Sequence, residues 1–316
     1  MRHNPVTAST GRRNCKRKTA PIRTTMQNTP PTGKSLQNNT ANFDFHCHST
    51  VSDGVLSPAD VVRRAVDNGV TSLSLTDHDD TSGCAEAARV AKELGIKFIN
   101  GVEISAQWQG HSVHIVGLGV ELQNAKLQTG LASVREGRRL RARRMADELE
   151  RLGIGDVLEG ALELSDRPAL ISRTHFARYL LHMGYAKSIQ GVFQNYLSPG
   201  KPGYVKHNWA QMTEALDWIK SAGGIAVLAH PGRYPFSNAK LKLLLGDFAD
   251  LGGRAIEVQS ASHSPDKANY FRKVALRHGF FASRGSDFHA PRESHADLGE
   301  LPQLSEDLIP VWHLLQ

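Results

Sequence analysis

The sequence has little cysteine and no long hydrophobic run. Its three cysteines are Cys15, Cys47 and Cys84, and no two of them have the CxxC spacing. This argues against a disulfide framework and against a zinc finger, and it favours the reducing cytoplasm. A transmembrane helix needs roughly 18 consecutive apolar residues, and no run in this sequence is that long. We therefore predict no transmembrane helix and no membrane partner.

Acidic residues are absent from the first 41 positions, which contain eight basic residues: Arg2, Arg12, Arg13, Lys16, Arg17, Lys18, Arg23 and Lys34. The other positions carry 30 Lys and Arg against 31 Asp and Glu, so the formal charge of +7 comes from this N-terminal segment. Non-specific DNA binding needs a positive surface on the fold itself. We expect no stable DNA complex.

Residues 1–41 are rich in Thr, Asn and Pro and lack hydrophobic periodicity, which predicts disorder. They also lack the apolar core of a secretory signal. Two interpretations stay open. An organellar transit peptide would fit the acid-free composition, and a mis-assigned start with translation from Met26 is the interpretation that we prefer.

From residue 42 the pattern alternates between short apolar runs and amphipathic stretches, which is typical of βα units and a mainly parallel sheet. Ser57 and Pro58 mark the first helix as N-cap and first-turn residue. We predict strands at Asn42–Cys47, Val70–Thr76, Ile96–Gly101, His111–Gly119, Gly224–Ala229, Ala255–Val258 and Phe280–Ser283. The predicted helices are Ser57–Gly69, Thr81–Leu94, Gln211–Ala222, Ala239–Leu251 and Pro265–His278. Residues 291–316 give only a weak helical tail.

Residues 122–208 interrupt this alternation with a predicted all-α insert. Its expected helices are Leu127–Leu152, Ser172–Met183 and Lys187–Tyr196, and the loop Ser198–His207 follows them. The first of these helices is densely charged with arginine.

Potential metal ligands recur where the predicted strands end. His46 and His48 close the first strand, and their spacing places both side chains on one face. The others are Asp53 in the next loop, His78 after the second strand, Glu103 after the third, His114 on the fourth, His230 after the first strand beyond the insert, and Asp287 with His289 after the last. The carboxyl ends of parallel strands lie together. Nine such residues in one place would be untenable without cations, which predicts a metal site.

A lone histidine is more often a structural or surface residue than a ligand, and we interpret His3, His182, His278 and His313 in this way. An HxH motif alone is a moderate signal. Its combination with Asp77-His78 after one hydrophobic strand and Asp287-x-His289 after another is much stronger.

The motifs together resemble a known family. FHCHS at 45–49, SDG at 52–54, LTDHD at 75–79, GVEI at 101–104, HIVG at 114–117 and GSDFH at 285–289 look like the successive motifs of the PHP (polymerase and histidinol phosphatase) family. The resemblance covers about residues 42–290. It implies an α/β fold, a distorted (β/α)7 barrel, built from residues 42–121 and 209–290, with the all-α insert 122–208 as a substrate cap and residues 1–41 and 291–316 as terminal segments.

The resemblance also implies a trinuclear metal centre. By motif position, the first metal would take His46, His48, Glu103 and Asp287, the second Glu103, His114 and His230, and the third Asp53, His78 and His289. Mixed histidine and carboxylate ligands suit manganese, iron or zinc better than magnesium. We therefore expect two or three divalent ions, with manganese as first choice. Clustered cations can activate a water and clamp phosphoryl oxygens, which makes the expected activity that of a phosphoesterase.

The catalytic candidates are Glu103, Asp287, His230 and Asp79. Asp79 could protonate a leaving oxygen, although we prefer to interpret it as a surface carboxylate or one behind the ligands. Cys47 lies between two ligands on a strand and must face away from them, so we expect it in the core.

The insert contains REGRR at 135–139, RTHFAR at 173–178 and GKPGY at 200–204. In these residues and in its position it resembles one branch of the family, the 3′,5′-nucleoside bisphosphate phosphatases and the 5′-to-3′ exoribonucleases that act on short RNA. Arginine binds phosphate bidentately, so an arginine-lined cap suits a substrate with a second phosphate. The candidates are Arg135, Arg138, Arg139, Arg143, His175 and Lys201 in the insert, and Arg233 after His230. For any single helix arginine, a solvated helix face is an equal alternative.

Three other functions stay open. A histidinol-phosphate phosphatase would use the same metal site, but the arginine-rich insert favours nucleotides. A metal-dependent amidohydrolase is possible because related barrels hydrolyse C–N bonds. A nucleic-acid-binding or polymerase-associated module is disfavoured by the near-neutral charge outside residues 1–41.

Overall fold

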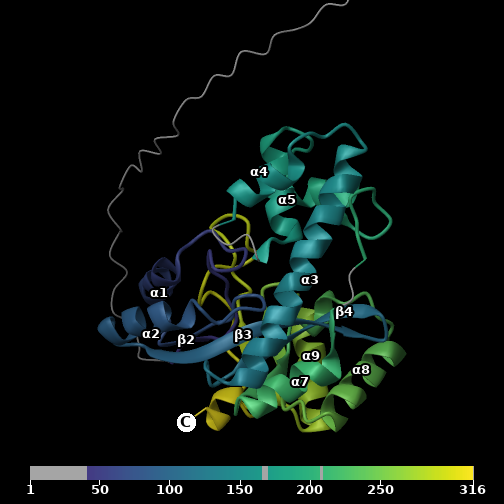
Figure 1. The fold of residues 1–316 in the computed structure, drawn as a ribbon. Helices are drawn as coiled ribbons and strands as arrows, with labels where there is room; N and C mark the ends of the chain where they lie inside the picture. The colour runs from purple at the N-terminus through teal and green to yellow at the C-terminus, as the bar shows by residue number, and fades with distance from the viewer. Residues whose placement is uncertain (1–40, 166–169, 207–208, 316) are drawn as a thin grey trace, which may run out of the picture. The chain divides into compact units, whose positions relative to one another are not determined.

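The computed structural model describes residues 41–165, 170–206 and 209–315 (Figure 1). The predicted disorder of residues 1–41 lies outside these residues, apart from position 41. Within the described part of the chain, no helix is long and apolar enough to cross a membrane.

The strands form a nearly closed barrel. They are β1 (Phe43–Asp44), β2 (Ser72–Leu75), β3 (Lys97–Trp108), β4 (His111–Leu118), β5 (Ala210–Gln211), β6 (Ile225–Leu228), β7 (Ala255–Ser260) and β8 (Phe281–Gly285). Seven of them follow the order β1-β2-β3-β4-β6-β7-β8, and β5 pairs with β3. The last strand returns to the first: the Phe45 amide donates to the Arg284 carbonyl at 3.0 Å and the Asp287 amide to the His46 carbonyl at 2.7 Å. The predicted α/β barrel is confirmed.

Strand β4 is the exception to parallel pairing, because it runs antiparallel to both β3 and β6. The prediction that the third strand ends at Gly101 was wrong, since β3 continues to Trp108 and turns directly into β4. Glu103 therefore lies within a strand and not after one. The register pairs Ser105 with His114. Side chains alternate along a strand, so Glu103, Ser105 and His114 share one face.

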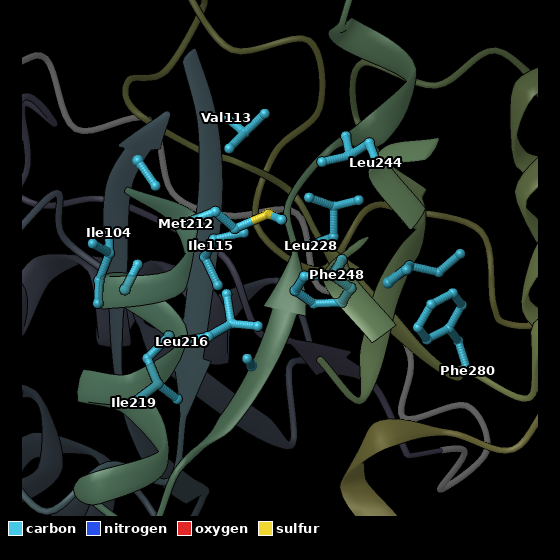
Figure 2. Packing of buried hydrophobic residues seen from close by; sticks show 14 of the residues in the cluster. Ile104, Val113, Ile115, Met212, Leu216, Ile219, Leu228, Leu244, Phe248 and Phe280 are labelled. Carbon is cyan, nitrogen blue, oxygen red and sulfur yellow. The ribbon is translucent and has the colours of Figure 1, made fainter. Parts of the chain in front are cut away.

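Helices cover the outside of the barrel. They are α1 (Pro58–Asp67), α2 (Cys84–Glu93), α7 (Met212–Ser221), α8 (Asn238–Asp250) and α9 (Pro265–His278). Ser57 accepts a hydrogen bond from the Asp60 amide and caps α1, as predicted. Figure 2 shows the largest apolar cluster, in which residues of β3, β4 and β6 pack against α7 and α8. This packing fixes the strands that carry the polar residues described below.

The described residues between β4 and β5 form helices and turns. The helices are α3 (Ala125–Glu150), α4 (Val157–Glu163), α5 (Arg173–His182), α6 (Ile189–Val192) and the π-helical turn η2 (Phe193–Leu197). We call residues 122–165 and 170–206 the helical segment. It has its own apolar cluster, which includes Leu149, Phe176 and Leu180. Helix α4 was not predicted, because its seven residues carry too short a pattern. Figure 1 shows α3 extending from the barrel to α4 and α5.

The C-terminal residues pack against β1 and β8, and we call these contacts the barrel floor. The predicted helical tail is wrong apart from the 3-10 turn η4 (Val311–Leu314). Trp312 stacks on Phe43 with ring centroids 3.9 Å apart. The fully buried Arg284 donates to the carbonyls of Pro302 and Gly299 at 2.9 and 3.0 Å. The tail is thus held by apolar contacts and by several arginines, because Arg64 pairs with Asp297 and Arg272 with Asp307, rather than by regular structure.

Candidate metal centre

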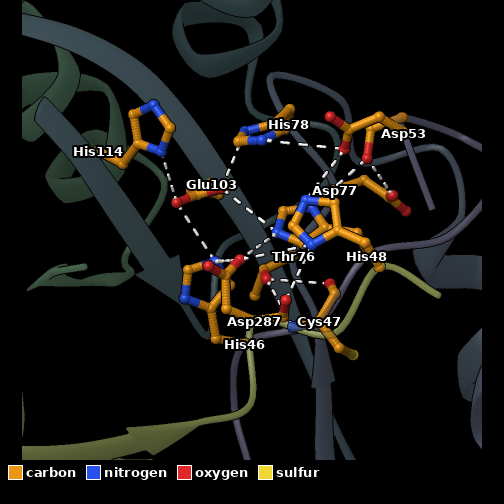
Figure 3. Close-up of polar contacts among 12 residues, drawn as sticks. His46, Cys47, His48, Asp53, Thr76, Asp77, His78, Glu103, His114 and Asp287 are labelled. Carbon is orange, nitrogen blue, oxygen red and sulfur yellow. Dashed lines mark hydrogen bonds and ion pairs between the residues drawn. The ribbon is translucent and has the colours of Figure 1, made fainter. Parts of the chain in front are cut away.

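The fold brings all nine predicted ligands to one edge of the barrel (Figure 3). Because β4 runs antiparallel, its first half lies at the edge where the neighbouring parallel strands end. Potential ligand atoms lie within 4.8 Å of one another in four groups: His48, Asp53, His78 and His289; His46, Glu103 and His230; His46, His48 and Asp287; His78, Glu103 and His114. These overlapping clusters are suited to metal binding.

Glu103 is the centre of this arrangement and is fully buried. Its carboxylate is approached by five histidine rings: His78 at 2.8 Å, His114 at 2.9 Å, His230 at 3.1 Å, His46 at 3.2 Å and His48 at 3.4 Å. Figure 3 shows Glu103 between His78 and His114. A carboxylate that contacts several ligand groups has the position expected of a bridging ligand.

Buried polar atoms that make no hydrogen bond test whether these residues fit a metal. Among the described residues, eight buried side-chain nitrogen or oxygen atoms make no hydrogen bond. Six of them belong to the nine candidates: His46 Nε2, His48 Nε2, Asp53 Oδ1, His78 Nδ1, Glu103 Oε2 and His230 Nδ1. Buried polar atoms are rarely left without a partner. Their concentration in one cluster fits coordination of divalent ions.

The carboxylates of the cluster are held in their ionised form. Burial by itself would raise the pKa of Glu103, but the charge of the facing His78 holds it well below its usual range. Burial likewise opposes ionisation of Asp53, and the facing His289 and His78 lower its pKa well below the ordinary value.

The histidines divide into two kinds. Burial, reinforced by His289, lowers the pKa of His48 to about 3, and burial lowers that of His114 to about 4 despite Glu103. Both rings are therefore neutral at pH 7 and keep a lone pair for a metal. For His289, burial is outweighed by Asp53, and its pKa rises to about 9. In the metal-free protein a proton on this ring partly balances the carboxylates.

Glu257 on β7 is a site residue that the sequence analysis missed. Its side chain is buried, with Oε1 2.6 Å from His46 Nδ1, and Oε2 accepts a hydrogen bond from the His230 amide at 2.5 Å. A carboxylate behind a ligating histidine fixes the ring orientation and raises its basicity. The available signal was a single acidic residue inside the otherwise uncharged run Ala255–Ser260.

Two further features fix the ligand loops. Asp77 accepts hydrogen bonds from the Ser49 hydroxyl and the Ser52 hydroxyl, both at 2.6 Å, and so holds the loop that carries Asp53. At Gly285 a Cβ atom would lie 2.2 Å from the Cβ of His46, so only glycine permits this approach.

Asp79 does not have the surface position that we considered for it. It is fully buried, with Oδ1 accepting from the Ser105 amide at 2.7 Å and Oδ2 from Arg138 Nε at 2.6 Å. Both oxygens are occupied as acceptors, so the geometry supports an anchoring role rather than proton donation. Cys47 is buried in the apolar cluster beside α1 and β2, as expected.

A cleft of about 660 Å³ connects the cluster to the helical segment. We call its two parts the metal end and the helical end. The metal end is the nine-residue cluster, of which Asp53, His78, Glu103, His114, His230, Asp287 and His289 line the cleft. The helical end is lined by Arg138, Arg141, Ser172, Arg173, Thr174, Phe193, Ser198, Pro199, Tyr204, Lys206 and Trp209.

The predicted substrate-binding residues are only partly at this cleft. Arg138 lines it, and so does Arg233, whose Nη1 lies 2.7 Å from Asp287 Oδ2. The other five do not belong to its lining: Arg135, Arg139, Arg143, His175 and Lys201.

Each of these five residues has another position. Arg135 donates to the Asp79 carbonyl at 2.8 Å, Arg139 is half-exposed and pairs with Glu136, and Arg143 is exposed. The buried His175 accepts a hydrogen bond from the Ser172 amide as part of a capping box at the start of α5. Lys201 is exposed in a turn.

Two arginines that were not among the predicted substrate-binding residues, Arg141 and Arg173, line the helical end beside Arg138. Burial, together with the charges of Arg173 and Arg138, lowers the pKa of Arg141 to about 9. Burial also lowers the pKa of Arg173, and Arg138 acts in the same direction. Three guanidinium groups held this close repel one another, and an anion between them would relieve that repulsion.

The described histidines that we interpreted as structural or surface residues lie on the surface, away from the ligand cluster. His182, His278 and His313 are exposed and lie outside the four ligand groups. His3 lies outside the described residues.

Comparison with known proteins agrees with this geometry. Residues 44–234 match the model of the PHP domain. The chain is 50% identical over 276 residues to a 3′,5′-nucleoside bisphosphate phosphatase of Chromobacterium violaceum, covering 87% of this chain and 97% of that protein. It is 41% identical over 274 residues to the 5′-3′ exoribonuclease Rnm of Escherichia coli, covering 86% and 93%.

Solved structures give the same result. A Chromobacterium violaceum protein described as an amidohydrolase, with bound sulfate and no metal, has a TM-score of 0.84 at 50% identity and covers 87% of this chain and 96% of its own. A Bifidobacterium adolescentis protein described as a metal-dependent phosphoesterase has a TM-score of 0.73 at 25% identity, covering 88% and 96%. The barrel, the nine-residue cluster and these matches together show that the chain belongs to the PHP family.

Proposed function

We propose that this chain is a metal-dependent phosphoesterase that hydrolyses phosphate esters of nucleotides. Its substrates are nucleoside 3′,5′-bisphosphates, from which it removes the 3′-phosphate, or short 5′-phosphorylated RNA, from which it releases nucleotides in the 5′-to-3′ direction, or both. One observation carries the proposal: a single cleft has a histidine and carboxylate cluster at one end and three arginines, one buried and two half-buried, at the other.

The nine residues of the cluster hold two or three divalent ions in this proposal, and manganese is the first choice because the ligands mix imidazole with carboxylate. When bound, such ions supply a hydroxide at neutral pH and neutralise charge on the phosphoryl oxygens. Glu103 bridges the ligand groups, and Glu257 keeps the His46 ring in its orientation. Arg233, beside Asp287, is placed to contact a phosphoryl oxygen of the bound ester.

The helical end binds the rest of the nucleotide. Arg141 and Arg173 offer planar donors that match a second phosphate. Trp209 stacks beneath the guanidinium of Arg138, whose carbon lies 4.9 Å from the ring centroid. Aromatic faces accept any base by stacking. In this proposal the helical segment acts as the substrate cap.

The activities of the two relatives support both substrates, since one is a 3′,5′-nucleoside bisphosphate phosphatase and the other a 5′-3′ exoribonuclease. Histidinol phosphate has no second phosphate to occupy the arginines, so a histidinol-phosphate phosphatase fits the helical end less well. The amidohydrolase description of one similar structure makes C–N hydrolysis the second candidate. We also propose a reducing, cytoplasmic location, which the two buried free cysteines support.

One experiment tests the proposal. Phosphate and nucleoside release would be measured for phosphoadenosine phosphate, histidinol phosphate, a short 5′-phosphorylated RNA and a simple amide, with manganese and again after chelation. We expect manganese-dependent turnover of the nucleotide substrates. Turnover of histidinol phosphate alone would contradict the role of the helical end, and turnover of the amide alone would contradict the chemistry.

A further inference from the structure

Asp53 belongs to the metal end, but the helical segment holds its side chain. Asp53 Oδ2 accepts hydrogen bonds from the Ser172 hydroxyl at 3.0 Å and the Thr174 hydroxyl at 3.1 Å. The opposite oxygen, Oδ1, lies 3.3 Å from His289 Nε2 and 3.9 Å from His78 Nε2. The two hydroxyls therefore fix the rotation of the carboxylate so that Oδ1 faces the two histidines.

Arg178, one turn further along α5, holds the backbone of the same region. Its Nη1 donates to the Asp53 carbonyl at 2.9 Å, and its Nη2 pairs with Glu293 at 3.0 Å. Glu293 lies in the loop that follows His289. One helix of the helical segment thus connects the two loops that carry Asp53 and His289.

We propose that Ser172, Thr174 and Arg178 are positioning residues for the ion held by His48, Asp53, His78 and His289. The helical segment is then a structural component of this metal group as well as a cover for the substrate. The proposal rests on the proposed function only for the presence of divalent ions. It predicts that losing the hydroxyls frees Asp53 to rotate, which weakens this ion and spares the groups around Glu103.

Thr174 gives the cleanest test, because Ser172 also caps α5 by accepting from the Thr174 amide. Thr174→Val keeps the shape of the side chain and removes the donor, whereas Thr174→Ser keeps the donor. Ser188→Ala is the matched control, since Ser188 caps α6 in the same segment and makes no contact with Asp53 among the described residues. The metal-stripped full chain of each variant would be titrated with manganese by calorimetry, and its thermal unfolding recorded without metal.

We expect Thr174→Val to raise the dissociation constant of one class of ion by about 10–100-fold, the usual effect of removing a partner behind a ligand. The other ions should bind as in the wild type, as should every ion in Thr174→Ser and Ser188→Ala. Wild-type affinities in a Ser172→Ala/Thr174→Val double variant would overturn the proposal. Equal weakening of all ions with lowered thermal stability would also overturn it, because the hydroxyls would then act only on the fold.

These outcomes are separate from failure of the proposed function. A wild-type chain that binds manganese but turns over no nucleotide would refute the activity, while a selective loss in Thr174→Val would still establish the positioning role. Normal nucleotide turnover by the wild type, together with unchanged manganese titrations in the variants, would support the activity and refute the positioning role.

Discussion

The metal end and the helical end of the cleft differ in how well their residues could be predicted from the sequence. All nine residues predicted for the metal end lie together in the structure. Of the six insert residues predicted for the helical end, only Arg138 lines the cleft, while Arg141 and Arg173 were missed. The carboxyl ends of the parallel strands lie at the same end of a barrel, so residues at these ends are close together whatever the details of packing. An arginine-rich helix has several possible faces, and packing chooses among them.

The largest expected effect is at the metal end. His48→Ala removes a ligand that belongs to two of the four groups. We expect kcat to fall by roughly a thousandfold, since a bound metal contributes several kcal/mol to transition-state stabilisation. Steady-state kinetics with manganese would measure this, with exposed His182→Ala as the control. Wild-type turnover by His48→Ala would refute the assignment of the metal end.

A smaller effect is expected from Glu257, which only the structure identified. Glu257→Gln keeps the size of the side chain but weakens its hold on His46. The dissociation constant for manganese should rise by about 10–100-fold. Metal titration compared with exposed Glu86→Gln would test this, and unchanged affinity would restrict the metal end to the residues that the motifs identify.

Acidification should weaken metal binding at the metal end. The pKa of His289 is raised to about 9 in the metal-free chain, so this ring is protonated below that pH and must lose its proton to bind a metal. Manganese affinity should therefore rise with pH by about tenfold per unit for each proton displaced, and level off above the raised pKa. Titrations between about pH 6 and pH 8 in buffers of different ionisation enthalpy would count the protons. Affinity independent of pH would contradict the role of His289.

The helical end should show the smallest effect, and a selective one. Arg141→Met or Arg173→Met should raise KM for a nucleoside bisphosphate by about tenfold, from the loss of about 1.5 kcal/mol of charged hydrogen bonding. KM for a nucleoside monophosphate should change much less. Arg139→Met and Arg143→Met are matched controls, because both residues are on the same helix as Arg141 and neither lines the cleft. If the controls behave like Arg141→Met, the cleft does not define the phosphate site.

The fold was predictable where local patterns are strong. The outer helices and most barrel strands were expected near their observed positions, because capping residues and apolar periodicity are local signals. The course of β3 was not, since the run through Glu103 to Trp108 becomes a strand only by pairing with β4. The floor contacts of Arg284 and Trp312 were also unpredictable, because they join residues far apart in the chain.

The motifs alone are enough to predict which residue types meet at the metal end, because each motif occupies a strand or its end and a closed sheet brings those positions together. The residues that support these ligands from behind could be identified only from the way the elements pack. Glu257 supports His46 from another strand, and Thr174 reaches Asp53 across 121 positions of the chain. The packing of α3 against its neighbours likewise sets which face of this helix lines the cleft. Such contacts depend on how whole elements pack, and no spacing along one element encodes that packing.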